Sequence, residues 1–316
     1  MSGAAEHEPV MVEEVVDLFR PVPPGPVVDA TVGLGGHGRA LLAALDHIRL
    51  IGLDHDGDAL AAAARTLAPY PGRVTLHRAR FDELSTVTRE EGPLSGALFD
   101  LGVSSLQLDR AERGFSFRAD GPLDMRQDQR AAATAADVVN EYDEARLARV
   151  LHVYGGERLS RRIAAAIVRS RPLHTTAQLA DVVRRAVPAP ARRRPGSGDP
   201  ARRTFQALRI EVNRDLDALG PALDQALGAL APGGRAVVLA YHSGEDRIVK
   251  ERFRTAATGG CTCPPQLPCV CGAAPEFRLL ARGVRRPTPL EVARNRRSES
   301  ARLRAIERLP GPGDAA

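Results

Sequence analysis

VVDATVGLGGHG, residues 27–38, decides the fold of this chain. The apolar pair Val27–Val28 leads into Asp29, a glycine-rich turn follows, and a helical apolar pattern begins at Ala40. A strand, a tight turn and a helix in this order form the opening unit of an α/β sheet that binds a nucleotide-like ligand. Because a Cβ atom would hold the backbone away from a ligand, the glycines predict a close approach at the turn.

Further apolar segments predict more strands of the same sheet, at residues 50–54, 74–77 and 96–100. Asp54 ends the second strand roughly 20 residues after the turn, where an acidic side chain bonds ribose hydroxyls. Capping of the next helix is the alternative role. With Asp29 and Asp100, three predicted strands end in aspartate. Since parallel strands end at one edge of a sheet, we expect a shared polar site there.

Other candidates also follow predicted strand ends. Phe81 comes after the third strand and is either a core residue or a surface for an adenine ring. A buried strand over 235–241 ends in a polar stretch, where helix capping is a strong alternative explanation for Ser243 taken alone. The remaining candidates are Ser104, Ser105 and Gln107 after the fourth strand, and His242 and Asp246 after the last. Of all the candidates at strand ends, we predict catalytic roles for Asp100, Ser104 and His242.

The strand–helix alternation stops after Asp109 and resumes after residue 204. Helical apolar spacing in between predicts an inserted all-helical domain over 109–204. Residues 1–108 and 205–316 would then form one discontinuous catalytic domain. The insertion ends in PAPARRRPGSGDPARR, residues 188–203, whose composition predicts a mobile basic loop.

The last part of the chain completes the predicted sheet. A single helix is expected over 204–230, and PGG at 232–234 predicts a turn before the last parallel strand. Residues 277–280 and 303–307 have the pattern of a terminal antiparallel pair, with a basic loop between them.

Composition narrows the class of protein. The chain has 316 residues, of which 43% are hydrophobic, enough for one large domain or two modest ones. The net charge of +5 weakly favours an anionic partner. The sequence has no long uncharged apolar run, so we expect no membrane span. The acidic N-terminal stretch lacks the apolar centre of a signal peptide, so we expect a cytoplasmic protein.

All four cysteines fall within residues 261–271, in the pattern C-x-C-x₅-C-x-C. This clustering argues against a scattered disulfide framework, and in the cytosol it favours a metal over disulfides. Zinc sites usually have C-x₂-C spacing, so the sequence leaves zinc binding open and we assign no metal ligands. The residues in question are Cys261, Cys263, Cys269 and Cys271.

The turn fits G-x-G-x-x-G with Gly33, Gly35 and Gly38, a pattern shared by dehydrogenases and methyltransferases. Asp29 is placed to receive a ligand ammonium group, which S-adenosylmethionine has and a dinucleotide lacks. A single turn of this kind also suits one adenosine-sized ligand. Two other classes stay open, an NAD-dependent dehydrogenase and a non-catalytic RNA-binding or assembly module. The second would use the arginine runs at 192–194, 202–203, 285–286 and 296–297.

Seven stretches then carry a resemblance that spans residues 7 to 304. They are HEPVM (7–11), DATVGLGGHG (29–38), DLGVSSLQLDRAERGFSFRADGPLDMR (100–126), YGGERLSRRIAAAIV (154–168), RRTFQALRIEVN (202–213), HSGEDRIVK (242–250) and NRRSESARLR (295–304). In these stretches the chain resembles the bacterial 16S rRNA cytosine-N4 methyltransferase family, RsmH or MraW. Gly244 departs from that family's motif, which has a leucine there.

The resemblance implies a class I, Rossmann-like S-adenosylmethionine-dependent methyltransferase fold whose inserted helical domain recognises RNA. It implies S-adenosylmethionine as the donor. The acceptor would be a cytidine in the decoding region of 16S rRNA, within the small ribosomal subunit. Asp29 and Gly33 are the cofactor residues expected from the turn itself. Those carried over by motif are Gly35, Gly36, His37, Asp54, Phe81, Asp100 and Gln107.

The expected chemistry agrees with methylation on nitrogen. The exocyclic amine of cytosine is a poor nucleophile because its lone pair is delocalised into the ring, so it needs acceptors that draw its N–H groups. Asp100, at a strand end, is placed to be such an acceptor. Methylation at C5 would need a cysteine nucleophile, and no cysteine precedes Cys261.

Overall fold

The computed structural model describes residues 9–189, 198–264, 266 and 270–311. The chain forms two compact units, which we call the sheet unit (residues 1–102 and 216–316) and the helical unit (103–215). These boundaries differ by several residues from the predicted ones, after 108 and after 204. The second differs because helix α11 (Ala201–Asn213) contributes Phe205 and Leu208 to the core of the helical unit.

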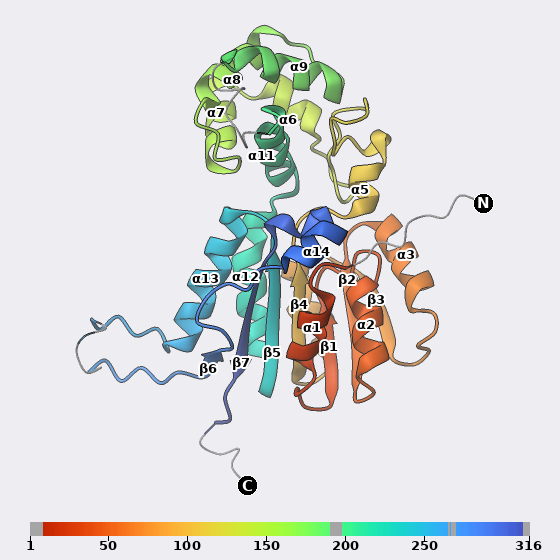
Figure 1. The fold of residues 1–316 in the computed structure, drawn as a ribbon, viewed down its shortest axis with the longest axis vertical. Coiled ribbons are helices and arrows are strands. Elements are labelled where there is room, and N and C mark those ends of the chain that lie inside the picture. Colours follow the sequence, from red (N-terminus) through yellow and green to blue (C-terminus); the bar gives the residue numbers. More distant parts are fainter. Residues whose placement is uncertain (1–8, 190–197, 265, 267–269, 312–316) are drawn as a thin grey trace. The chain divides into compact units, whose positions relative to one another are not determined.

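The sheet unit is built on one seven-stranded sheet in the order β3-β2-β1-β4-β5-β7-β6 (Figure 1). Strands β1 to β5 are parallel, and β7 runs antiparallel between β5 and β6. This arrangement confirms the predicted Rossmann-like sheet with a terminal antiparallel pair. The strands are β1 Gly25–Asp29, β2 Ile48–Asp54, β3 Val74–Arg78, β4 Leu94–Asp100, β5 Leu230–Ala240, β6 Phe277–Leu279 and β7 Arg302–Arg308.

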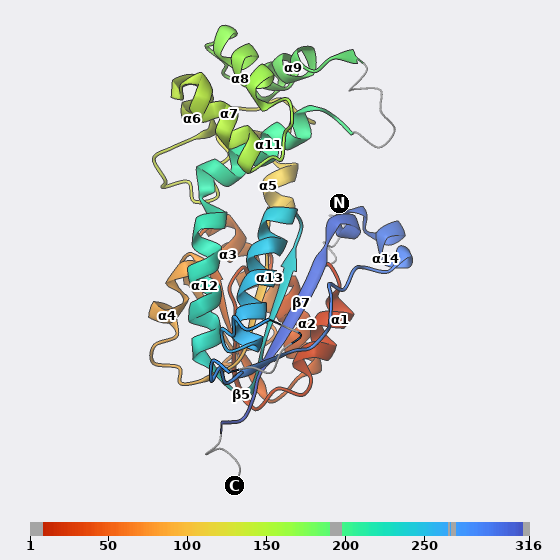
Figure 2. The ribbon, with the colours of Figure 1, turned by 90° about the vertical axis from the view of Figure 1, so that its left-hand side faces the viewer.

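Both faces of this sheet are covered by helices, so its central strands are apolar on both sides. Val27 of β1 belongs to the core beneath one set of helices, and its neighbour Val28 to the core beneath the other. Figure 2 shows α1 and α2 on one side of the strands and α4 and α12 on the other. The first set is α1 Val12–Phe19, α2 Gly36–Ala44 and α3 Gly57–Leu67; the second is α4 Leu84–Val87, α12 Asp215–Ala229 and α13 Ser243–Ala257.

Three local expectations were wrong. The single helix expected over 204–230 is broken at Arg214, whose φ of 53° ends α11 before α12 begins. The expected turn at 232–234 lies inside β5, where the pairing register with β4 shifts. The expected basic loop contains helix α14 (Pro289–Arg294) and the 3₁₀ helix η3 (Arg296–Ser300). Thr288 caps α14 by accepting from the Glu291 amide, and proline suits the first helical position.

The helical unit has its own apolar core, which includes Leu147, Ile163, Leu179 and Phe205. Thr175 caps α9 by accepting from the amide of Gln178, as the sequence predicted. The helices of this unit are α5 Ser105–Asp109, η2 Ala111–Arg113, α6 Ala135–Glu141, α7 Glu144–Val153, α8 Ser160–Arg169, α9 Thr176–Ala186 and α11. Over the described part of the chain, no helix combines the length and apolar character needed to cross a bilayer.

Candidate active site

Three parallel strands end in aspartate at the same edge of the sheet, as predicted. Asp29 is the last residue of β1, Asp54 of β2 and Asp100 of β4. The register fixes their proximity, because Asp29 pairs with Gly52 on one side and with Leu98 on the other. A cluster of three carboxylates therefore forms the centre of the candidate site.

Asp29 is the most deeply buried of the three, with only 2% of its surface exposed. Burial raises its pKa from 3.8 to about 7, and the charges of Asp100 and Asp54 add to the rise. His37 and the amide of Thr31, which donates to the carboxylate over 3.2 Å, act in the opposite direction. Among the described residues, no lysine or arginine pairs with Asp29. The carboxylate is thus placed to gain from a cationic ligand group.

Asp54 holds the glycine turn against the end of β2. One carboxylate oxygen accepts from the amide of Gly33 over 3.1 Å, and the other from the amide of Asp56 over 2.9 Å. Burial raises the pKa of Asp54. The alternative that Asp54 caps the next helix is wrong, because the side chain of Asp56 caps α3 by accepting from the amide of Asp58. Each oxygen of Asp54 still has a lone pair for another donor, such as a ribose hydroxyl.

Glycine is favoured at two positions of the turn for different physical reasons. Gly35 adopts a left-handed conformation, φ 80°, at the position that precedes α2. Gly36 is required by packing, since a Cβ there would lie 2.6 Å from the side chain of Pro9. The close approach expected for a ligand is therefore made at Gly36 by the protein's own chain.

Asp100 is held from three sides. Its amide donates to the hydroxyl of Thr31 over 2.7 Å, and its Oδ1 accepts from the hydroxyl of Tyr241, also over 2.7 Å. Its Oδ2 lies 3.5 Å from Nδ1 of His37. The buried ring of His37 is in turn fixed by a 2.9 Å contact between Nε2 and the carbonyl oxygen of Val10. These contacts fix the direction in which the Asp100 carboxylate points.

Sequence reasoning missed Tyr241, which follows β5 directly. Burial raises the pKa of its hydroxyl well above the ordinary value, and the charge and hydrogen bond of Asp100 raise it further. The hydroxyl therefore stays protonated and remains a donor. Glu245 positions the residue by accepting from its amide over 2.8 Å. A tyrosine at the end of a strand that faces the polar edge was the signal that could have revealed it.

His242 has a structural task that the sequence did not predict. Its Nδ1 accepts from the amides of Gly244 and Glu245, and so it caps α13. Its Nε2 lies 3.0 Å from Oε1 of Glu245. Since both ring nitrogens are engaged at a helix end, the geometry favours capping over the predicted catalytic role. A glycine fits at position 244 because a Cβ there would lie 3.1 Å from this ring.

Three other predicted residues make structural contacts of their own. Phe81 is 7% exposed and packs edge-on against Phe99, with 6.4 Å between ring centroids, so the core role is the one the structure displays. Ser104 and Gln107 belong to the helical unit. There they form a reciprocal cap at the start of α5, with each side chain accepting from the other's amide.

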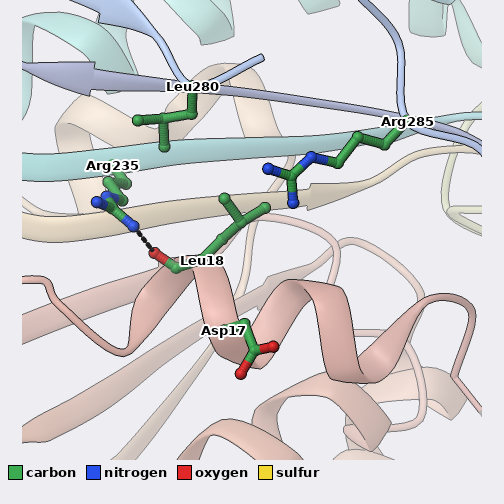
Figure 3. Close-up of a pocket in the computed structure, with 5 residues that line it drawn as sticks. All are labelled: Asp17, Leu18, Arg235, Leu280 and Arg285. Carbon is green, nitrogen blue, oxygen red and sulfur yellow. Dashed lines mark hydrogen bonds between the residues drawn. The ribbon is translucent and has the colours of Figure 1, made fainter.

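A separate pocket of the sheet unit lies beside α1 (Figure 3). Arg235 donates to the carbonyl oxygen of Leu18 over 2.6 Å and pairs with Glu307 at the same distance. None of the predicted site residues lines this pocket, whose walls are Asp17, Leu18, Arg235, Leu280 and Arg285. The carboxylate cluster therefore remains the candidate site.

Comparisons with known proteins show which family this chain resembles. The family described as "MraW methylase family" matches residues 4–309. A "Ribosomal RNA small subunit methyltransferase H" of Frankia alni is 53% identical over 317 residues, covering 97% of this chain and 96% of that protein. The protein of the same name from Mycobacterium sp. strain KMS is 51% identical over 319 residues, covering 98% and 85%. An rRNA methylase structure from Streptococcus thermophilus has 11% identity and a TM-score of 0.44, covering 97% and 100%.

Proposed function

The chain belongs to the MraW methylase family, and on that premise we propose that it methylates N4 of one cytidine in small-subunit ribosomal RNA. S-adenosylmethionine is the methyl donor. The target lies in the decoding region of 16S rRNA and is methylated within the small ribosomal subunit. Relatives about half identical to this chain are named small-subunit rRNA methyltransferases, which supports the RNA as substrate.

The buried carboxylate of Asp29 is the observation that carries this proposal. S-adenosylmethionine bears an ammonium and a sulfonium and, when bound, supplies an electrophilic methyl group. A carboxylate whose pKa is raised to about 7, beside Asp54 and Asp100, is stabilised in its charged form by such a cation. Asp29 would bind the ammonium group and Asp54 the ribose hydroxyls. The turn at Gly33 and Gly35 would contact the remainder of the ligand. The described residues thus fit this ligand.

Asp100 would orient the acceptor amine. A hydrogen-bond acceptor that lies away from the direction of attack can draw the N–H groups toward itself. The N4 lone pair of cytosine then becomes available to attack the methyl group. Tyr241 occupies Oδ1 of Asp100 and His37 faces Oδ2, so the carboxylate cannot rotate freely. Each oxygen has two acceptor positions, so one can still receive an N–H of the substrate. The same carboxylate would accept the proton that the amine loses when its bond to the methyl carbon has formed.

The competing classes are weaker. Membership in a methylase family removes the main reason to consider a dehydrogenase or a non-catalytic module. Methylation at C5 would need a thiolate near the carboxylates, whereas all four cysteines follow α13 in sequence. Helix α13 begins at the carboxyl edge and is 15 residues long, which places its far end roughly 20 Å away.

We assign RNA recognition to the helical unit and to arginine runs on both units. Arg202 and Arg203 lie on α11, Arg296 and Arg297 on η3, and Arg285 forms a bridge to Leu303 of β7. The run at 192–194 lies outside the described residues. Guanidinium groups neutralise phosphates, so these positions are suited to the RNA backbone.

The deciding experiment is methylation of small-subunit particles, isolated from cells that lack the enzyme, with S-adenosylmethionine labelled in its methyl group. Nuclease digestion and nucleoside chromatography should place the label in N4-methylcytidine. Free 16S rRNA should be labelled more slowly than the particle. Label in C5-methylcytidine, or none in a preparation that binds the donor, would overturn the proposal.

A further inference from the structure

The cysteine segment between α13 and β6 has no part in the proposed reaction. It runs from Thr258 to Glu276, between the helix end at Ala257 and the strand start at Phe277. Figure 1 shows its described residues extending away from the body of the sheet unit. Its described residues form no helix or strand, and long connections of this kind are uncommon in compact domains and need a physical reason.

Apolar burial does not hold this segment together. No described residue from Thr258 to Glu276 is buried, and Val270 is 88% exposed. A segment without buried residues gains little from the hydrophobic effect to offset the loss of chain entropy on ordering. Short units without a core are commonly stabilised by covalent or metal cross-links.

The base of the segment is nevertheless well defined. The amide of Cys261 donates to the carbonyl of Thr258, which continues the end of α13. Gly259 has φ 59° and lies so close to the opposite arm that a Cβ there would be 2.6 Å from the carbonyl oxygen of Ala274. On the return side, the carbonyl of Glu276 accepts from the amide of Leu309. The two arms are therefore brought together immediately before the cysteines.

We propose that Cys261, Cys263 and Cys271 form a structural zinc site. Their three sulfur atoms all lie within 4.8 Å of one another, although the first and the last are ten positions apart in sequence. Around a tetrahedral zinc with bonds near 2.3 Å, thiolate sulfurs are separated by roughly 3.8 Å. Small rotations of the side chains close that difference, so one ion can be reached by all three.

The chemistry of the donors selects the metal. Thiolates are soft ligands that favour zinc over magnesium or calcium, and structural zinc sites take three or four cysteines. The sequence holds a fourth cysteine, Cys269, which lies outside the described residues; the proposal rests on the three that are described. Each thiol loses its proton on binding, so zinc affinity falls as the pH falls. The ion would cross-link the two arms, whose described residues are not buried.

The test uses the full chain, purified under reducing conditions without added metal or metal-affinity resin. Metal analysis should find about one zinc per chain. Cys261→Ser, Cys263→Ser and Cys271→Ser should each bring this below roughly a tenth, whereas the matched control Val270→Ser should retain it. Val270 suits this purpose because it lies within the same segment and is solvent-exposed.

Two further readouts do not depend on methyl transfer. Cobalt added to the metal-free protein should give the visible bands of a tetrahedral thiolate site in the wild type and in Val270→Ser, but not in Cys263→Ser. Chelation of zinc should speed hydrogen exchange in residues 258–276 while S-adenosylmethionine binding stays unchanged. Fully reduced protein that takes up neither metal would overturn the proposal. So would a disulfide among these cysteines in freshly isolated protein, or iron in place of zinc.

Discussion

Replacing Asp29 with asparagine should stabilise the ligand-free protein in a pH-dependent way. The folded state holds this carboxyl with a pKa of about 7, against 3.8 for an ordinary aspartate. Between those values the folded protein binds more protons than the unfolded chain. The free energy of unfolding of the wild type therefore falls as the pH rises from about 4 to 7. The full destabilisation by the charged carboxylate is present above pH 7.

The size of this cost follows from the shift. A rise of roughly three pH units corresponds to roughly 4 kcal/mol at the rate of 1.36 kcal/mol per unit. The side chain introduced by Asp29→Asn would be neutral throughout, and its oxygen can still accept from Thr31. A weaker bond there costs about 1 kcal/mol at every pH. The stability of Asp29→Asn minus that of the wild type should thus grow by about 2 kcal/mol between about pH 5.5 and 7, and then level off.

Urea unfolding of ligand-free protein, followed by far-ultraviolet circular dichroism, measures this difference; the sheet unit is the part expected to respond. Asp46→Asn is the matched control, because it removes one negative charge from a fully exposed side chain. A difference for Asp29→Asn that stays constant with pH would refute the reasoning. The affinity for S-adenosylmethionine should depend on the charge of the same carboxyl group, but in the opposite direction to the stability. In the wild type it should rise with pH up to about 7, by at most about tenfold per unit, and in the variant it should be low and flat.

Four further predictions concern the site and the RNA. Asp54→Ala should lose roughly 1.5–3 kcal/mol of S-adenosylmethionine affinity, since charge-assisted bonds to the ribose are removed; unchanged calorimetric binding by folded protein would reject that role. Asp100→Asn should greatly lower single-turnover methylation with a much smaller effect on donor affinity, and equal losses would reduce Asp100 to a binding residue. Tyr241→Phe, which frees the Asp100 carboxylate, should slow single-turnover methylation roughly tenfold, and an unchanged rate would show that its hydroxyl is dispensable. Serine at positions 192–194 should weaken RNA binding and flatten its dependence on salt, while an unaltered slope would mean that this run is only solvated.

The sheet could be predicted from sequence because its strands are short apolar runs that end in conspicuous residues. The three aspartates at strand ends were found in this way, and the structure places all three at the final residue of a strand. Boundaries inside the helical segments were harder. The break at Arg214 depends on one residue with positive φ, and nothing in the periodicity of the surrounding helices marks it.

Side-chain roles at the sheet edge were predictable only in part. His242 and Ser104 stand where catalytic residues commonly stand, but each also precedes a helix and can satisfy its free amides. The sequence alone does not decide between capping and catalysis. Tyr241 was missed for a related reason, since its hydroxyl meets Asp100 across 141 positions of sequence, a contact that only the β4–β5 pairing creates.

The cluster of carboxylates is unfavourable for folding, and this is the strongest physical reason to regard it as a site. Asp29 is almost fully buried, and its pKa is raised by burial and by two neighbouring carboxylates. An asparagine would keep the hydrogen bond to Thr31 and avoid that cost. A fold that holds an ionisable group in this state pays for it in stability, and a cationic ligand is what would recover the energy on binding. The same residue should therefore destabilise the ligand-free protein and be stabilised when the donor is bound.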